Sequence, residues 1–92
     1  MFKVNEYFNG KVKSIAFTVD NDKATVGVMA VGEYEFGTQS IEHMTLVSGE
    51  MSVKLANDDW RSINLNETFV VAADSSFLVK ITKVASYLCV YK

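Results

Sequence analysis

The chain has 92 residues, which is enough for one small domain with a thin core. Its formal net charge is −2, and it has no block of Lys or Arg that would favour binding to duplex nucleic acid. That charge does not exclude a small anionic ligand, because two or three well-placed cations can bind one phosphate. We therefore expect a single domain over residues 1–92 and no nucleic-acid partner.

The N-terminal stretch MFKVNEYFNGKVKS has neither the apolar run nor the small-residue cleavage site of a signal peptide. No segment approaches the roughly 18 consecutive apolar residues of a transmembrane helix. Cys89 is the only cysteine, so it has no internal disulfide partner, and its apolar neighbours favour a buried, unreactive thiol. These features favour a cytoplasmic protein that does not bind membranes.

The hydrophobic pattern predicts β-structure along the whole chain, because no helical period of about 3.6 residues persists for more than a turn. Asp20-Asn21-Asp22 and Asn57-Asp58-Asp59 supply turns. Gly49 is expected to close a hairpin, and Gly27 and Gly32 to mark bends or bulges in a curved sheet. The expected strands cover residues 11–19, 24–36, 43–48, 51–55, 60–65, 68–72, 77–82 and 86–91. About eight or nine short strands predict an all-β sandwich or barrel.

One spacing matches the first metal-binding motif of the cupins, which are small β-barrels. That motif reads His-x-His, three or four residues, Glu, six residues, Gly. Here Phe36 and Thr38 stand at the two histidine positions, and Glu42 and Gly49 stand at the other two. The frame predicts that Phe36, Thr38 and Glu42 face the interior of the barrel.

The second cupin motif also lacks its histidine, and Phe77 at that position is expected to face inward from the opposing sheet. Ala72, Asp74 and Phe77 occupy its Pro, Gly and His positions, so the third histidine ligand is also missing. The only histidine, His43, neighbours Glu42 and should face the opposite side of its strand. Because a metal site normally takes three or four ligands, we expect no metal and no other cofactor. A metal-dependent cupin dioxygenase or isomerase would need ligands that this sequence lacks.

Several longer blocks carry a more specific resemblance. They are NEYF (5–8), GKVKSI (10–15), VGVM (26–29), GEY-F (32–36), Glu42 with Met44-Thr45 and Val47-Ser48-Gly49, and SYLC-Y (86–91). Over essentially the whole chain these blocks are similar to the short cupins called pyrimidine/purine nucleoside phosphorylases. The resemblance implies a homodimeric, metal-free, cupin-like β-barrel (jelly roll) that occupies residues 1–92. It also implies a pentosyltransferase that cleaves many nucleosides with phosphate, giving ribose 1-phosphate and free base.

Two departures from the family pattern bear on activity. The family commonly has Pro-Gly where this chain has Ala72-Ala73, so this turn must form without the preset φ of proline. The family also carries Arg between the last Cys and Tyr, where this chain has Val90. If that arginine contacts phosphate in relatives, another cation does so here or activity is reduced. A non-catalytic cupin that binds a sugar or nucleoside is therefore the alternative function.

Phosphorolysis requires a stabilised oxocarbenium-like sugar, and a carboxylate suits that task. Glu42 is the candidate catalytic residue, since a carboxylate that faces a barrel interior is costly unless it is paired or functional. The alternatives for Glu42 are a structural ion pair and an exposed turn. Tyr34, Phe36, Thr38 and Phe77 are the candidate substrate-binding residues, because stacking on aromatic rings tolerates any base. As an alternative, these aromatic side chains belong to the core.

Phosphate binding requires cations, and three are candidates. Lys11 and Lys13 share one face of their strand, and Arg61 is the only arginine. The alternatives are that the lysines protect a sheet edge and that Arg61 pairs with the neighbouring aspartates. The terminal run YLCVY (87–91) is apolar on both faces, which indicates burial of the second face against another subunit. We therefore expect a homodimer.

Overall fold

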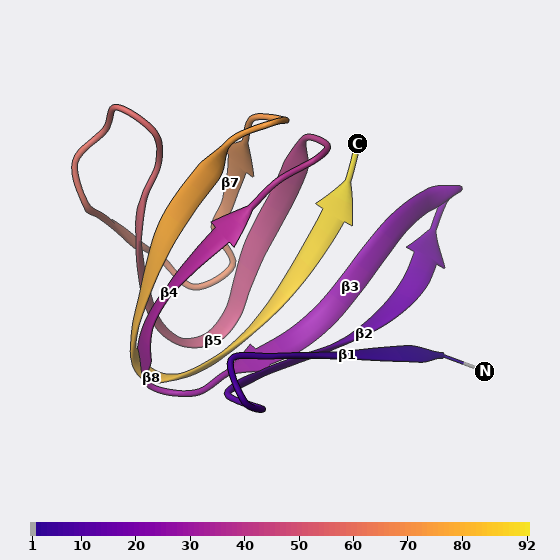
Figure 1. Cartoon of the computed structure of the whole chain (residues 1–92), viewed down its shortest axis with the longest axis horizontal. Helices are drawn as coiled ribbons and strands as arrows, with labels where there is room; N and C mark the ends of the chain where they lie inside the picture. The colour runs from indigo at the N-terminus through magenta and orange to yellow at the C-terminus, as the bar shows by residue number, and fades with distance from the viewer. Residues whose placement is uncertain (1) are drawn as a thin grey trace.

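A computed structural model describes residues 2–92, which form eight strands (Figure 1). The strands are β1 (Lys3–Tyr7), β2 (Val12–Val19), β3 (Asp22–Met29), β4 (Gly32–Gly37), β5 (Glu42–Lys54), β6 (Arg61–Ile63), β7 (Thr68–Val71) and β8 (Ser76–Tyr91). The all-β fold expected from the hydrophobic pattern is confirmed. Within residues 2–92, no helix is long and apolar enough to cross a membrane.

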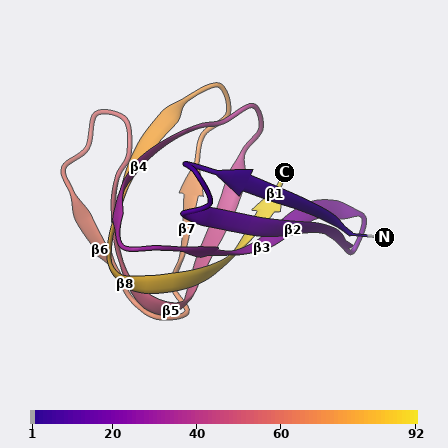
Figure 2. The same ribbon diagram turned by 60° about the horizontal axis from the view of Figure 1, so that its bottom comes forward.

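The two longest strands, β5 and β8, pair with each other and belong to both halves of the molecule (Figure 1). Residues 85–91 of β8 pair with β3, which continues through β2 to β1, whereas residues 76–81 pair with β4. Residues 42–45 of β5 pair with β7, and residues 51–53 pair with β6. The eight strands therefore form one continuous, bent antiparallel sheet whose two halves share β5 and β8. We call these halves the two sheets, and the larger one contains β1, β2 and β3. In Figure 2, β4, β5, β6 and β8 wrap around one side, and β1, β2 and β3 form the other.

Alternation along the strands separates an inner face from an outer face. The inner face supplies the core: Val12, Met29, Tyr34, Met44, Leu46, Met51, Val53, Ile63, Phe69, Val71, Phe77, Val79, Ile81, Ala85, Tyr87 and Cys89 are all buried. Cys89 is thus buried, as predicted. The expected inward orientation of Phe77 is also confirmed.

The β2–β3 turn forms where the sequence indicates. Asp20 and Asn21 have φ values of 48° and 73°, which is the left-handed pair required by a tight two-residue hairpin. Asn and Asp tolerate these values better than most residues, since their short polar side chains can bond to the local backbone. This hairpin sets the register of β2 against β3 from Val19 and Asp22 onwards.

The expected hairpin at Gly49 is wrong. Residues 42–54 form one continuous strand, and the register between β5 and β8 shifts between Leu46 and Ser48, between Ser48 and Glu50, and between Glu50 and Met51. Gly49 has a φ of 88° within this irregular stretch, so the glycine serves a bulge that bends the strand. A bulge and a turn both favour glycine at positive φ, which is why the local pattern suggested a turn.

Other boundaries also differ from the expected ones. The run 24–36 is divided between β3 and β4 by a break at Ala30 and Val31, residues without turn-forming character. Residues 77–82 and 86–91 belong to the single strand β8. Strand β1 was not expected, because its sequence KVNEY carries three polar residues and its side chains stay largely exposed.

Candidate functional site

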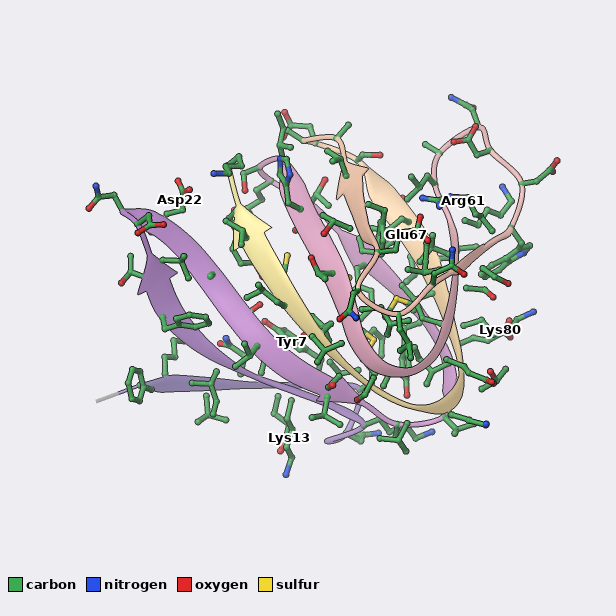
Figure 3. All side chains as sticks on the ribbon, turned by 180° about the vertical axis from the view of Figure 1, so that it is seen from behind. Tyr7, Lys13, Asp22, Arg61, Glu67 and Lys80 are labelled. Atoms are coloured by element: carbon green, nitrogen blue, oxygen red, sulfur yellow. The ribbon has the colours of Figure 1, made fainter. Side chains whose placement is uncertain are left out.

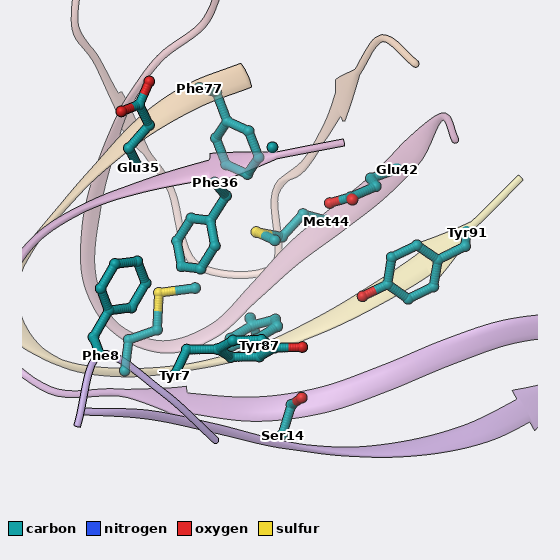
Figure 4. A pocket seen from close by; sticks show the side chains of 12 residues that line it. Tyr7, Phe8, Ser14, Glu35, Phe36, Glu42, Met44, Phe77, Tyr87 and Tyr91 are labelled. Atoms are coloured by element: carbon teal, nitrogen blue, oxygen red, sulfur yellow. The ribbon is translucent and has the colours of Figure 1, made fainter. Parts of the chain in front are cut away.

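A pocket of about 400 Å³ opens between the two sheets (Figure 4). This volume lies within the range of small-molecule sites, about 300–1,000 Å³. One end is aromatic, with Phe8, Phe36 and Phe77, and the other end is polar and includes Ser14, Glu42, Tyr87 and Tyr91. The lining comes from β1, β2, β3, β4, β5 and β8 and from the turn after β1, so the site forms only when both sheets are assembled.

The aromatic end is a continuous series of rings. The Phe36 centroid lies 5.7 Å from that of Phe77 and 5.6 Å from that of Phe8, the second pair edge to face. Phe8 has a φ of 53°, an uncommon conformation for a bulky residue, and this turn places its ring at the pocket. The sequence therefore identified Phe36 and Phe77 as pocket residues but missed Phe8.

Glu42 lies at the polar end, at the start of β5, with its carboxylate directed toward the pocket (Figure 4). The Cys89 thiol donates a hydrogen bond to Glu42 Oε1 at 3.6 Å. Among residues 2–92, the ion pairs do not include Glu42. Burial raises the pKa of Glu42, and the thiol hydrogen bond opposes part of that rise. The site thus holds an unpaired carboxyl group in a partly desolvated position.

Two tyrosines of β8 lie near Glu42. The Tyr91 hydroxyl is 3.2 Å from Thr25 Oγ1, and burial raises the pKa of Tyr87 to about 12. Burial likewise raises the pKa of Tyr91. Both phenols therefore stay protonated at neutral pH and can donate hydrogen bonds to a ligand.

Gly27 makes room for Tyr87. A Cβ built on Gly27 would meet the Tyr87 hydroxyl oxygen at 2.5 Å, so the phenol ring lies directly over this glycine. The pairing of β3 with its two neighbours is regular through Gly27, so this glycine does not form a bulge. Close approach of the Tyr87 side chain gives a steric reason for the glycine.

Tyr34 and Thr38 lie outside the pocket lining. The Tyr34 hydroxyl donates to the Ala30 carbonyl at 2.6 Å. The Tyr34 side chain is buried in the core, with its ring centroid 5.0 Å from that of Phe8. The Thr38 hydroxyl donates to the Ala72 carbonyl at 2.7 Å and accepts from the Ser75 amide at 3.0 Å. These bonds fasten the β7–β8 turn, which explains how Ala72-Ala73 is held without proline.

The three cations expected to bind phosphate also lie away from this pocket. Lys11 is exposed in the β1–β2 turn. Lys13 points outward from β2 (Figure 3), with its Nζ 3.6 Å from Glu6 Oε1. Arg61 lies on β6 with its Nη1 2.5 Å from Glu67 Oε2 (Figure 3). The Asn64 amide, which donates to Glu67 Oε1, and secondly Arg61 hold the pKa of Glu67 below its usual value. Arg61 thus pairs with Glu67 rather than with the neighbouring aspartates.

The polar residues Ser14, Tyr87 and Tyr91 were missed by sequence reasoning. The run YLCVY did indicate the two tyrosines, because Tyr87, Cys89 and Tyr91 alternate onto one face of the strand. A phenol hydroxyl that is buried there needs a hydrogen-bond partner. Within residues 2–92, no group of three or more His, Cys, Asp and Glu side chains is placed to hold a metal ion.

Comparison with known proteins identifies one family over nearly the whole chain. The sequence model of the family described as "Pyrimidine/purine nucleoside phosphorylase" matches residues 2–91. A protein of that name from Pseudomonas putida (strain GB-1) is 56% identical over 93 residues, which cover 100% of this chain and 99% of the relative.

Two solved structures are also similar. A Vibrio parahaemolyticus protein of unknown function is 42% identical, with a TM-score of 0.95 over 100% of this chain and 99% of that chain. A protein of unknown function from Acinetobacter sp. ADP1 is 29% identical, with a TM-score of 0.91 over 98% of this chain and 90% of that chain. The similarity therefore extends over the whole domain.

Proposed function

Because the chain belongs to the pyrimidine/purine nucleoside phosphorylase family, we propose that it cleaves both purine and pyrimidine nucleosides with inorganic phosphate. The C1′–N bond breaks, and its electron pair leaves with the base nitrogen. A lone pair on a phosphate oxygen forms the new C1′–O bond. Monohydrogen phosphate enters with one proton, and that proton ends on the departing base. The products are ribose 1-phosphate and free base.

The observation that carries this proposal is an unpaired, half-buried carboxyl group facing a series of aromatic rings. Phe36 and Phe77 would stack on the base, and stacking does not distinguish purine from pyrimidine. Glu42 in its ionised form would lie against the ribose and stabilise the positive charge that develops at C1′. Tyr87 and Tyr91 would donate hydrogen bonds to the sugar. Broad substrate range follows from the apolar character of the base-binding end.

The test is release of free base from uridine and adenosine by the purified protein, with and without inorganic phosphate. We expect release of both bases only when phosphate is present, with ribose 1-phosphate formed in equal amount. Base release without phosphate would indicate hydrolysis instead. Absence of release from every purine and pyrimidine nucleoside tested would contradict the proposal.

One observation favours a second candidate, a non-catalytic nucleoside-binding protein. No Lys or Arg from residues 2–92 lines the pocket that contains Glu42. A pocket with a carboxyl group and no cation suits a neutral nucleoside better than a phosphate dianion. Saturable nucleoside binding without turnover in phosphate would favour this candidate.

We also propose a homodimer formed through the outer face of the larger sheet. A cross-strand row of Val4, Ile15, Val26 and Leu88 crosses four neighbouring strands, and the first three residues are 62%, 42% and 41% exposed. An apolar face of this kind can pair with itself about a two-fold axis. Light scattering of the purified protein should give twice the chain mass of 10.2 kDa. A monomeric mass would contradict the dimer.

A further inference from the structure

A second hollow, of about 1050 Å³, adjoins the pocket at the ends of β1, β2 and β3. Tyr91 lines both spaces, so its ring is part of the wall between them. Lys3, Lys23, Gln39 and Ser40 are among the other residues that line the hollow. No Asp or Glu from residues 2–92 lines it, whereas Glu35 and Glu42 border the pocket. The two adjoining spaces thus differ in the sign of their charge.

Strand register explains why a cation and a carboxyl group lie on opposite sides of Tyr91. Tyr91 of β8 is the partner of Lys23 on one side and of Glu42 on the other. Directly paired residues on neighbouring strands point to the same face, so all three side chains share the inner face. Neighbouring strands are about 4.8 Å apart, which puts the Lys23 and Glu42 backbones about 10 Å apart with Tyr91 between them.

The remaining cations have other roles or other positions. Of nine Lys and Arg residues in the chain, five form ion pairs within residues 2–92: Lys13, Arg61, Lys80, Lys83 and Lys92. Lys11 lies in an exposed turn, and Lys54 belongs to β5 beyond the bulge. Lys3 and Lys23 are therefore the cations that have no ion-pair partner in the described structure and that border the hollow next to the pocket.

From these positions we propose that Lys23 and Lys3 bind inorganic phosphate in this second hollow. Lys23 provides the charge nearest to the sugar-binding end, and Lys3 provides a second cation from β1. The Thr25 hydroxyl and the Gln39 amide supply neutral hydrogen-bond donors around it. The role of this phosphate as the attacking substrate depends on the proposed phosphorolysis, but the binding site itself does not.

The arrangement separates two charges that would repel each other in one pocket. A phosphate dianion beside Glu42 would be destabilised by Coulomb repulsion in a partly desolvated space, whereas in the hollow it meets two cations. A nucleoside whose base lies on Phe36 and Phe77 would hold its sugar near Tyr91. Phosphate would then reach C1′ from the Lys23 side, opposite to the departing base.

The test is a comparison of Lys→Gln variants in two series, with phosphate varied at saturating uridine and uridine varied at saturating phosphate. We expect K23Q to raise the KM for phosphate about tenfold or more, in keeping with loss of a charge-assisted bond, while the KM for uridine changes less than twofold. K3Q should act in the same direction, and Lys23→Arg should restore most of the loss. K54Q is the matched control and should leave both constants unchanged. If K11Q raises the KM for phosphate and K23Q does not, the proposal is overturned.

A binding measurement separates this proposal from the proposed reaction. Inorganic phosphate is titrated into the isotope-labelled protein while backbone amide chemical shifts are recorded. We expect saturable changes at Lys23, Thr25 and Tyr91 that K23Q weakens about tenfold, whether or not the protein turns over nucleosides. An inactive protein with these changes would refute phosphorolysis and keep the phosphate site. An active protein whose K23Q variant binds phosphate normally would refute the site and keep the reaction.

Discussion

Replacing Glu42 with Gln should lower kcat/KM for nucleoside phosphorolysis on the order of 100-fold, the size of effect seen when one pre-organised electrostatic group is removed. Gln keeps the shape and one carbonyl oxygen of Glu42 but cannot carry a negative charge. Loss of rate therefore reports the charge near C1′ rather than packing. Steady-state kinetics with uridine at saturating phosphate measure this change. Glu50→Gln is the matched control, because Glu50 lies on the same strand, is exposed and is outside the pocket lining.

The pH dependence of kcat/KM is a second test of the role of the Glu42 charge. Burial raises the pKa of Glu42 above 4.5, so protonation of Glu42 should add an inflection above that pH to the acidic limb of kcat/KM, beside the protonation of monohydrogen phosphate, and E42Q should lack that inflection. An acidic limb that persists unchanged in E42Q would assign it to another group. Wild-type activity in E42Q would show that Glu42 is not catalytic.

The stability of E42Q should change in the opposite direction to its activity. The folded protein holds the Glu42 proton more tightly than the unfolded chain does. The resulting stabilisation is present at low pH and is lost as the pH rises through the raised pKa. At pH 7.5 the ionised carboxylate therefore destabilises the fold relative to a neutral amide. We expect E42Q to melt at a higher temperature than the wild type at pH 7.5, with the difference shrinking toward pH 4. Differential scanning calorimetry at both values measures this.

The strands and the inner face follow from the sequence wherever alternation is strong. Phe36, Glu42 and Phe77 were predicted to face the interior, and the structure places all three around one pocket. The prediction works for them because the period of two along a strand fixes the face of a side chain once one neighbour is known to be buried. The cupin spacing supplied that reference. The catalytic and substrate-binding roles of these residues stay predictions.

The cation positions could not be predicted in the same way. The nearness of Lys23 to Glu42 depends on β8 lying between β3 and β5, with Tyr91 paired to both residues. This pairing joins segments that are far apart in the chain, and local alternation carries no information about it. Lys11 and Lys13 were predicted to bind phosphate because alternation puts them on one face of a strand, yet Lys13 faces away from the pocket. A site assembled from several strands needs the register as well as the pattern.

Gly49 provides the test of how the two sheets are joined. A Cβ added to Gly49 would lie 2.2 Å from the Val84 carbonyl oxygen and 2.6 Å from Ala85 Cα, both backbone atoms that cannot move without disturbing β8. Its φ of 88° adds the usual strain of a non-glycine residue. We expect Gly49→Ala to cost about 3 kcal/mol or more and to lower the melting temperature by about 15 °C, as measured by calorimetry.

A matched variant separates the clash from the backbone strain. Gly10 has a φ of 86°, close to that of Gly49, but a Cβ there would approach no atom nearer than 3.6 Å. Gly10→Ala should therefore cost only about 1–2 kcal/mol, the penalty of the left-handed conformation alone. Equal losses in the two variants would show that the approach of β8 to Gly49 contributes nothing. A larger loss for Gly49→Ala means that contact between β5 and β8 at the bulge requires glycine. Since both sheets of the pocket meet through these two strands, that contact also fixes the position of Glu42 relative to Phe36 and Phe77.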